Sequence, residues 1–177
     1  GGKNPMLVLD DADLDTAVEG AVRACFANAG QLCIAVERLY VQRPLFREFA
    51  ERFAERASQM RIEGGYAWDV DMGSLVSQDQ LDKVTAHVED AVAKGATLLA
   101  GGHALPEIGP LFFAPTLLEG VTPDMDLYAD ETFGPVVALY PFDADDEGIR
   151  LANDTDYGLN ASVWSQNPTR ARHLARQ

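Results

Sequence analysis

Basic residues are scarce in this 177-residue sequence, and long apolar runs are missing. Lys and Arg number 14 against 28 Asp and Glu, which gives a formal net charge of −14. A protein that binds a phosphate backbone or an anionic membrane needs a basic face, so the composition argues against nucleic-acid and membrane partners. No apolar run approaches the ~20 residues that span a bilayer, and no secretory signal pattern opens the chain. We therefore expect a cytoplasmic protein.

Cysteine and histidine are also few. Cys25 and Cys33 are the two cysteines, and the three histidines are scattered. Without a CxxC pair or a histidine cluster, we expect no metal site. Cys25 falls on the apolar stripe of a predicted helix, whereas Cys33 lies beyond Gly30, where that helix should end. We therefore expect two reduced thiols and no disulfide, as is usual in a cytosolic chain.

The sequence does contain a regular alternation of strand-like and helical segments. Apolar or alternating runs predict strands at 6–9, 36–42, 96–100, 135–142 and 158–165. Helical spacing predicts helices from Asp11 or Asp13 to Ala27, from Pro44 to Gly64–Gly65, over 78–94 and 143–154, and from 167 onward. This order predicts one α/β domain with an open, largely parallel sheet flanked by helices.

The stretch NAGQLCIA, residues 28–35, sets a thiol directly after a helix end. A cysteine of pKa ~8.5 is only slightly ionised at neutral pH, but its thiolate is a strong nucleophile. Nearby backbone amides would lower that pKa, and Gly30 leaves room for a substrate to approach. Taken alone, these local residues favour a small buried cysteine without reactivity. Locally, Cys33 can therefore be a nucleophile or a core residue.

A second stretch, ETFGPVV, leads from a turn into a buried strand. Ligands of open α/β sheets gather at strand ends and the adjoining loops. There, the Glu131 carboxylate could accept hydrogen bonds from sugar hydroxyls, and Phe133 could pack on a flat ring. A solvated glutamate and a core phenylalanine explain the same residues. A third stretch, NDTDYGL at 153–159, has the composition of a structural turn.

Four motifs in register give these residues a joint interpretation. They are GGKNP at 1–5, NAGQLC at 28–33, ETFGPVV at 131–137 and NDTDYGLNASVW at 153–164. Together they resemble the catalytic domain of the NAD(P)-dependent aldehyde dehydrogenase superfamily, and the resemblance covers essentially the whole chain. GQLCIAVERLYV and YADETFGPV look most like the succinate-semialdehyde dehydrogenase type.

The resemblance implies a role for each candidate residue. It identifies Cys33 as the catalytic thiol, which attacks an aldehyde and passes through a thiohemiacetal and a thioester. Glu131 would bind the nicotinamide ribose of NAD or NADP, and Phe133 would contact the nicotinamide. Gln80 and Lys83 match positions that reach the adenine-side ribose. The resemblance also implies a small aldehyde as substrate and a homo-oligomer in the full-length protein, with Asn28 and Gln31 as scaffold of the thiol loop.

The resemblance also implies that parts of the site lie outside the sequence. In the family, the general-base Glu precedes the first Gly-Gly by two residues, and the cofactor-binding domain carries the Asn that helps hold the oxyanion. Residues 1–177 would then be the catalytic domain truncated at both ends, and we expect no aldehyde turnover from the isolated chain. An apolar face should be exposed where the cofactor-binding domain docks.

The sequence leaves alternatives open for the substrate and for the type of reaction. Some succinate-semialdehyde enzymes carry an Arg six residues before the nucleophile, and this sequence has Ala27 there. A CoA-acylating semialdehyde dehydrogenase would use CoA in place of water to release the acyl group. A non-catalytic relative with the same fold is the alternative from another class, although a structural role would not need Cys33, Glu131 and Phe133.

Overall fold

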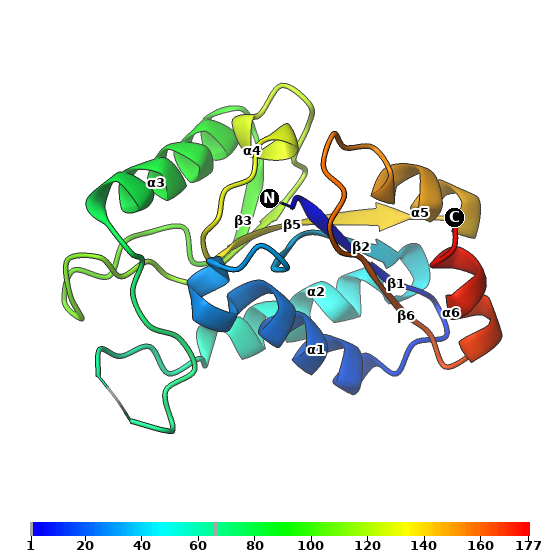
Figure 1. Cartoon of the computed structure of the whole chain (residues 1–177), viewed down its shortest axis with the longest axis horizontal. Helices are drawn as coiled ribbons and strands as arrows, with labels where there is room; N and C mark the ends of the chain where they lie inside the picture. Colours follow the sequence, from blue (N-terminus) through cyan, green and yellow to red (C-terminus); the bar gives the residue numbers. More distant parts are fainter. Residues whose placement is uncertain (1, 66) are drawn as a thin grey trace.

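The fold is built on one six-stranded sheet in the order β3-β4-β5-β2-β1-β6. The computed structural model describes residues 2–65 and 67–177. The strands are β1 (Asn4–Val8), β2 (Val36–Gln42), β3 (Thr97–Ala100), β4 (Thr116–Glu119), β5 (Val136–Phe142) and β6 (Ser162–Trp164). Every pairing is parallel except that of β3 with β4. The predicted open, largely parallel α/β sheet is therefore confirmed (Figure 1).

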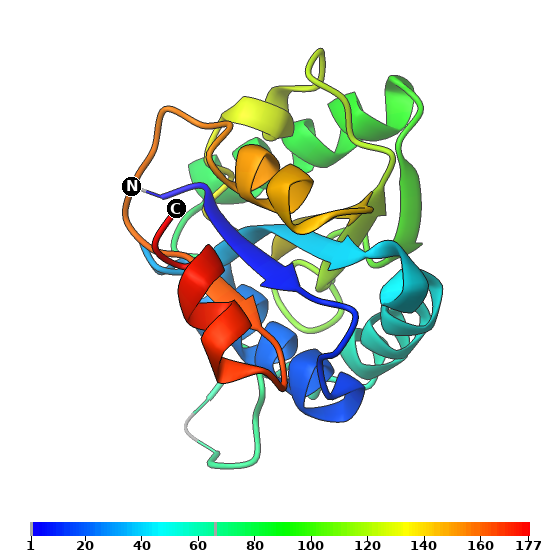
Figure 2. The same cartoon turned by 90° about the vertical axis from the view of Figure 1, so that its right-hand side faces the viewer.

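Helices cover both faces of this sheet. They are α1 (Leu14–Phe26), α2 (Arg43–Ser58), α3 (Gln78–Ala93), α4 (Asp126–Ala129), α5 (Asp145–Ala152) and α6 (Pro168–Leu174), and a short 3-10 turn, η1 (Ala27–Gly30), follows α1. Figures 1 and 2 show α1 and α2 on one side and α3, α4 and α5 on the other. None of the described helices is long and apolar enough to cross a bilayer.

Alternating residues of β1 reach the two sides of the sheet. Met6 and Val8 belong to the large core with α1 and α2, whereas Leu7 and Leu9 join a smaller core with Leu174 of α6. This is the two-residue period of a strand with both faces covered. The central strand β2 is buried at all seven positions, so the apparent polar alternation of VERLYVQ does not mark a solvent face.

A local cap sets the start of α1, whereas contacts with a distant segment follow the end of α2. Asp13 caps α1 by accepting from the amide of Thr16, as one of the two predicted caps. The prediction that the second helix reaches Gly64–Gly65 is wrong, because α2 ends at Ser58. After this end the Arg61 amide donates to the Asp71 carboxylate, and Ile62 forms a β-bridge with Met72. These contacts with a distant segment outweigh the helical spacing.

The last strand is shorter than the sequence pattern predicts. We expected a strand over 158–165, but β6 covers only Ser162–Trp164. The preceding residues form a loop because Asn160 donates its backbone amide to the Asn4 side chain. That hydrogen bond ties the loop to the start of β1, next to the candidate site.

Candidate active site around Cys33

Cys33 lies in a loop between η1 and β2, and this loop has an unusual backbone. Asn28, Ala29 and Gly30 have φ values of 53°, 54° and 69°. A side chain on Gly30 would place its Cβ 2.1 Å from the backbone oxygen of Gly134. The two loops that contain the NAGQLC and ETFGPVV motifs are therefore in direct backbone contact, and glycine permits the approach.

The two cysteines differ sharply in environment. Cys33 is exposed and Cys25 is 1% exposed, and both thiols are free. Burial, and secondarily the Glu37 charge, raises the pKa of the Cys25 thiol, which makes it a core residue as predicted. Among the described residues, nothing hydrogen-bonds to Cys33 Sγ or to its backbone amide, while its carbonyl accepts from Asn4. The thiol and the amide beside it are both available to a ligand.

Asn28 and Gln31 hold the shape of this loop. The Asn28 side chain donates to the Gln31 carbonyl at 3.1 Å, and Gln31 Nε2 donates to the Asn28 carbonyl at 3.1 Å. Gln31 also accepts from the amide of Val76 at 2.8 Å and donates to the carbonyl of Ser74 at 3.2 Å. These side chains bind backbone atoms on both sides of the thiol loop, which confirms their expected scaffold role.

Three exposed apolar residues lie in the thiol loop or in segments near it. Ile34 is 55% exposed, Leu159 54% and Val76 78%. Hydrogen bonds tie their segments to the thiol loop, since Val76 binds Gln31 and the Asn160 side chain donates to the carbonyl of Ile34. We call Ile34, Val76 and Leu159 the apolar rim, because they lie in or beside segments that are hydrogen-bonded to the thiol loop.

The loop at 130–134 carries the predicted cofactor residues. Glu131 is half-buried, and its Oε1 accepts from the amide of Gly2 at 2.8 Å. Phe133 is half-buried and has a φ of 54°. An aromatic residue enters this left-handed region only where its surroundings hold it there, and such strain often occurs at functional sites. The sequence did not predict this strain.

Gln80 and Lys83 of α3 contact the same loop. Gln80 Nε2 donates to the carbonyls of Thr132 and Phe133, both at 2.8 Å. Lys83 Nζ donates to the carbonyl of Glu131 at 2.7 Å. The structure thus gives these side chains a role in holding the loop backbone. A direct contact with a cofactor ribose stays a prediction.

Sequence reasoning missed the buried polar residues behind the two loops. Lys3 Nζ lies 2.7 Å from Glu37 Oε2, and these side chains are 2% and 4% exposed. Glu37 accepts from the amides of Thr132 and Phe133, each at 2.9 Å. Burial lowers the pKa of Lys3, and the Glu37 charge opposes that shift. The available signal was the charged Glu37-Arg38 pair inside an apolar strand.

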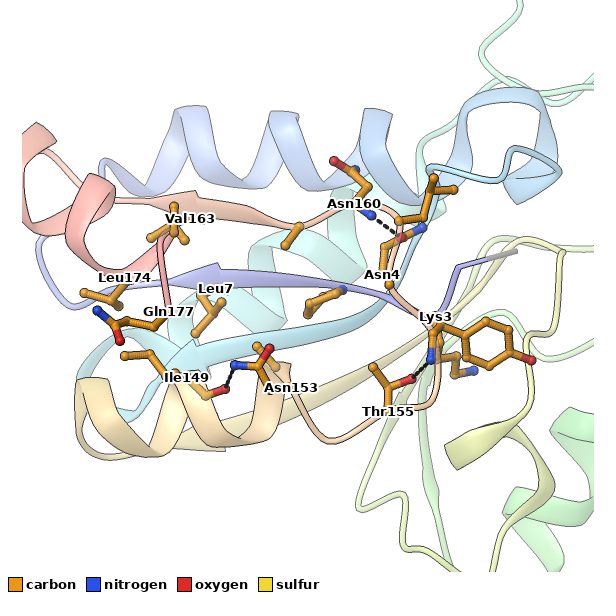
Figure 3. Close-up of a pocket in the computed structure, with 17 residues that line it drawn as sticks. Lys3, Asn4, Leu7, Ile149, Asn153, Thr155, Asn160, Val163, Leu174 and Gln177 are labelled. Carbon is orange, nitrogen blue, oxygen red and sulfur yellow. Dashed lines mark hydrogen bonds between the residues drawn. The ribbon is translucent and has the colours of Figure 1, made fainter.

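Asn4 was also missed as a site residue, although it belongs to the GGKNP motif. Its Nδ2 donates to the carbonyls of Cys33 and Ala35 at 2.9 and 2.7 Å. Its Oδ1 accepts from the amide of Asn160 at 3.0 Å (Figure 3). Asn4 is buried and uses both ends of its amide, so it fixes the thiol loop to β1.

A cavity of about 420 Å³ lies beside β1, between α5, α6 and β6 (Figure 3). Asn153, Thr155 and Tyr157 of the NDTDYGL stretch line it, but Cys33, Glu131 and Phe133 do not. Two residues linked to the thiol loop do line it, namely Asn4, which donates to the carbonyl of Cys33, and Leu159 of the apolar rim. Within residues 2–65 and 67–177, no three His, Cys, Asp or Glu side chains are grouped to hold a metal ion.

Comparisons with known proteins agree on one family. Residues 1–177 match the family described as "Aldehyde dehydrogenase family". The chain is 53% identical to the Mycolicibacterium smegmatis protein named "Putative succinate-semialdehyde dehydrogenase (NADP+)", over 100% of the chain and 34% of that protein. It is 43% identical to the Sinorhizobium fredii protein named "Probable succinate-semialdehyde dehydrogenase (NADP+)", over 99% of the chain and 35% of that protein.

Solved structures agree with this result. Betaine aldehyde dehydrogenase of Staphylococcus aureus in complex with NAD+ is similar with a TM-score of 0.95 and 34% identity, over 99% of this chain and 35% of that one. An aldehyde dehydrogenase of Brucella melitensis is similar with a TM-score of 0.91 and 44% identity, over 99% of this chain and 36% of that one. The chain thus spans about a third of the length of the relatives it matches.

Proposed function

Because the chain belongs to the aldehyde dehydrogenase family, we propose that it supplies the nucleophilic thiol and part of the cofactor site of an NAD(P)-dependent aldehyde dehydrogenase. One observation carries the proposal: Cys33 is an exposed thiol whose backbone amide makes no hydrogen bond with the described residues, in a loop packed directly against the loop of Glu131 and Phe133. A core residue or a purely structural cysteine would need neither access nor an unused amide.

The chemistry proceeds on Cys33. Its thiolate attacks the carbonyl carbon of the aldehyde, and the C–S bond forms as the carbonyl oxygen becomes an oxyanion. The Cys33 amide is free to stabilise that oxyanion in the thiohemiacetal. NAD(P)+, when bound, accepts the hydride that leaves this carbon. Hydrolysis of the resulting Cys33 thioester then releases the carboxylic acid and regenerates the thiol.

The residues of the 130–134 loop fit a nicotinamide cofactor. Glu131 Oε1 is held by the Gly2 amide, and its Oε2 accepts no hydrogen bond from the described residues, so that oxygen is available to a ribose hydroxyl. Phe133 follows two residues later in the chain, is half-buried and offers a flat apolar face to an aromatic ring. Either NAD or NADP is compatible with these two contacts.

We propose that the remaining parts of the catalytic cycle come from a longer protein, which acts as a homo-oligomer. The chain covers 34% of the M. smegmatis relative, and the base that activates water, a second oxyanion donor and most of the cofactor site would lie in the other two thirds. On this proposal, the 177-residue chain alone does not oxidise aldehydes. The apolar rim at Ile34, Val76 and Leu159 is the surface where these parts would approach the thiol.

Succinate semialdehyde is the first substrate to test. Two similar relatives carry that substrate in their names, and a small aldehyde suits a thiol on an open loop. Ala27 is exposed and offers no positive charge to a substrate carboxylate, so any recognition of that carboxylate would come from elsewhere.

A chimera tests the proposal. In it, residues 1–177 replace the matching third of the M. smegmatis relative, and NADPH formation is measured with succinate semialdehyde. We expect turnover from the chimera, none after Cys33→Ser, near-normal turnover after Cys25→Ser, and none from the isolated chain. A folded chimera with an intact Cys33 and no turnover on any aldehyde would contradict the proposed function.

A further inference from the structure

The buried ion pair of Lys3 and Glu37 connects the first strands to the 130–133 loop. Lys3 Nζ is 2.7 Å from Glu37 Oε2 and donates to the carbonyl of Asp130 at 2.8 Å. Glu37 Oε2 accepts from the Thr132 amide and Oε1 from the Phe133 amide, both at 2.9 Å. Both carboxylate oxygens are therefore committed to the backbone of the loop.

The buried Lys3–Glu37 pair contributes little to the free energy of folding. Removing two charges from water costs about as much as their attraction returns, so a buried pair adds little net stability over an apolar one. The pair does more to fix the position of the loop backbone, because charged hydrogen bonds are short and directional. Here they fix two consecutive amides, and the second belongs to Phe133, whose φ of 54° is strained.

The two residues that flank Lys3 also bind the loops of the site. The Gly2 amide binds the Glu131 carboxylate, and the Asn4 side chain binds the carbonyl of Cys33. Three consecutive residues at the start of β1 thus contact the loop of Glu131 and the loop of Cys33. A shift of this segment would change the relation between the two loops.

We propose that the Lys3–Glu37 pair is the positioning unit of the site, which holds the Glu131 and Phe133 loop at a fixed place relative to the Cys33 loop. Neither residue touches the reacting atoms; both act through the backbone of Thr132 and Phe133. The part of this inference that concerns cofactor binding rests on the proposed function, whereas the part that concerns the loop does not.

Amide hydrogen exchange tests the loop part on the 177-residue chain. In Glu37→Gln, one carbonyl oxygen replaces two carboxylate oxygens, and the new NH2 group faces an amide donor. We expect exchange at Thr132 and Phe133 to accelerate about tenfold more than at Ala138 of β5, because a charge-assisted hydrogen bond is lost. Glu19→Gln is the matched control, since Glu19 pairs with Arg56 at the surface, and should leave the loop amides unchanged.

A second variant keeps the test interpretable if the first one does not fold. Glu37→Gln alone leaves the Lys3 ammonium buried without its partner, which can unfold the chain. The double variant Lys3→Met with Glu37→Gln removes both charges and should fold while the two loop amides still exchange faster. Equal acceleration at Thr132, Phe133 and Ala138, or unchanged protection at the loop, would overturn the proposal.

Steady-state kinetics in the chimera test the cofactor part. Glu37→Gln should raise the KM for NADP+ about tenfold, in line with the lost hydrogen bond, and leave the KM for the aldehyde unchanged. Glu37→Asp, which keeps the charge, should restore part of the cofactor affinity. Equal changes in both KM values, or no change, would overturn the cofactor part. An inactive chimera with unaltered Glu37 contradicts the proposed function instead, and the exchange data then decide the positioning role.

Discussion

At the scale of single residues, the contrast between Cys33 and Cys25 separates an exposed thiol from a core residue. The two lie eight positions apart in sequence, yet one is exposed and the other is 1% exposed. Thiol reactivity depends on access and on the thiolate fraction. The raised pKa of Cys25 disfavours its thiolate at neutral pH, so Cys33 is the more accessible thiol of the two.

Iodoacetamide should therefore modify Cys33 much faster than Cys25 in the folded chain. We expect at least about a hundredfold difference in rate, because labelling of Cys25 has to wait for opening of the core. Peptide mass spectrometry after timed quenching measures both rates in one sample. In a strong denaturant the two rates should converge, which serves as the control. Comparable rates in the folded chain would show that Cys33 is not distinguished by its environment.

His87 provides a residue-scale prediction about pH. It is 8% exposed, and its Nδ1 lies 3.1 Å from Thr132 Oγ1. Burial, with the charges of Lys83 and Lys3, lowers its pKa, while Asp126 and Asp130 act in the opposite direction. The unfolded chain, with a histidine pKa of about 6.5, therefore binds this proton more readily than the folded chain does. The stability that neutral His87 supplies is complete above about pH 6.5 and is lost as the pH falls toward the folded pKa.

The substitution His87→Gln should remove this pH dependence. The free energy of unfolding of the native chain should fall by up to about 1.4 kcal/mol per pH unit from this one group below pH 6.5. The variant should lack that part of the slope. Urea unfolding at several pH values measures it, with His103→Gln as an exposed control. Identical slopes in all three chains would refute the role of His87.

At the scale of elements, local patterns predicted most helices and strands but not the loops that form the site. The 3.6-residue period identified α1 and α3, the alternation of VERLYVQ identified β2, and the apolar run at 135–142 identified β5. Their side chains repeat along the chain, so the sequence records the pattern. The predicted lengths of α2 and β6 were wrong because of long-range contacts. Arg61 binds Asp71 after the end of α2, and Asn160 binds Asn4 before the start of β6.

The candidate site was predictable to a similar degree. Cys33, Glu131 and Phe133 lie in short motifs, and the sequence indicates them as candidates. The supporting contacts of Lys3, Asn4 and Glu37 join residues 29 to 156 positions apart. No local spacing reveals such pairs. The strain at Phe133 is likewise a product of the folded environment.

Gly30 gives the prediction at this scale. Gly30→Ala should destabilise the chain by about 1–3 kcal/mol, because its φ of 69° disfavours a side chain and the new Cβ would collide with the Gly134 oxygen. It should also alter the labelling rate of Cys33, because the two loops are forced apart. Gly73→Ala is the control, since nothing lies within 4 Å of its Cβ position. Equal stability of the two variants in urea would contradict the close loop contact.

At the scale of the whole molecule, the structure brings distant motifs to one place. The starts of β1, β2 and β5 bring residues 2–4, the Cys33 loop and the 130–134 loop together. The side chains of the apolar rim, Ile34, Val76 and Leu159, are exposed. The chain spans about a third of its relatives, which agrees with a site that a larger protein completes.

The most direct test of the central claim is to find the acyl group on Cys33. The chimera is mixed with NADP+ and succinate semialdehyde, quenched in acid during turnover, and digested for mass spectrometry. We predict a succinyl thioester on the peptide that contains Cys33, absent when NADP+ is omitted and absent from the Cys25 peptide. Turnover without any acyl adduct on Cys33, or turnover that survives Cys33→Ser, would contradict the account.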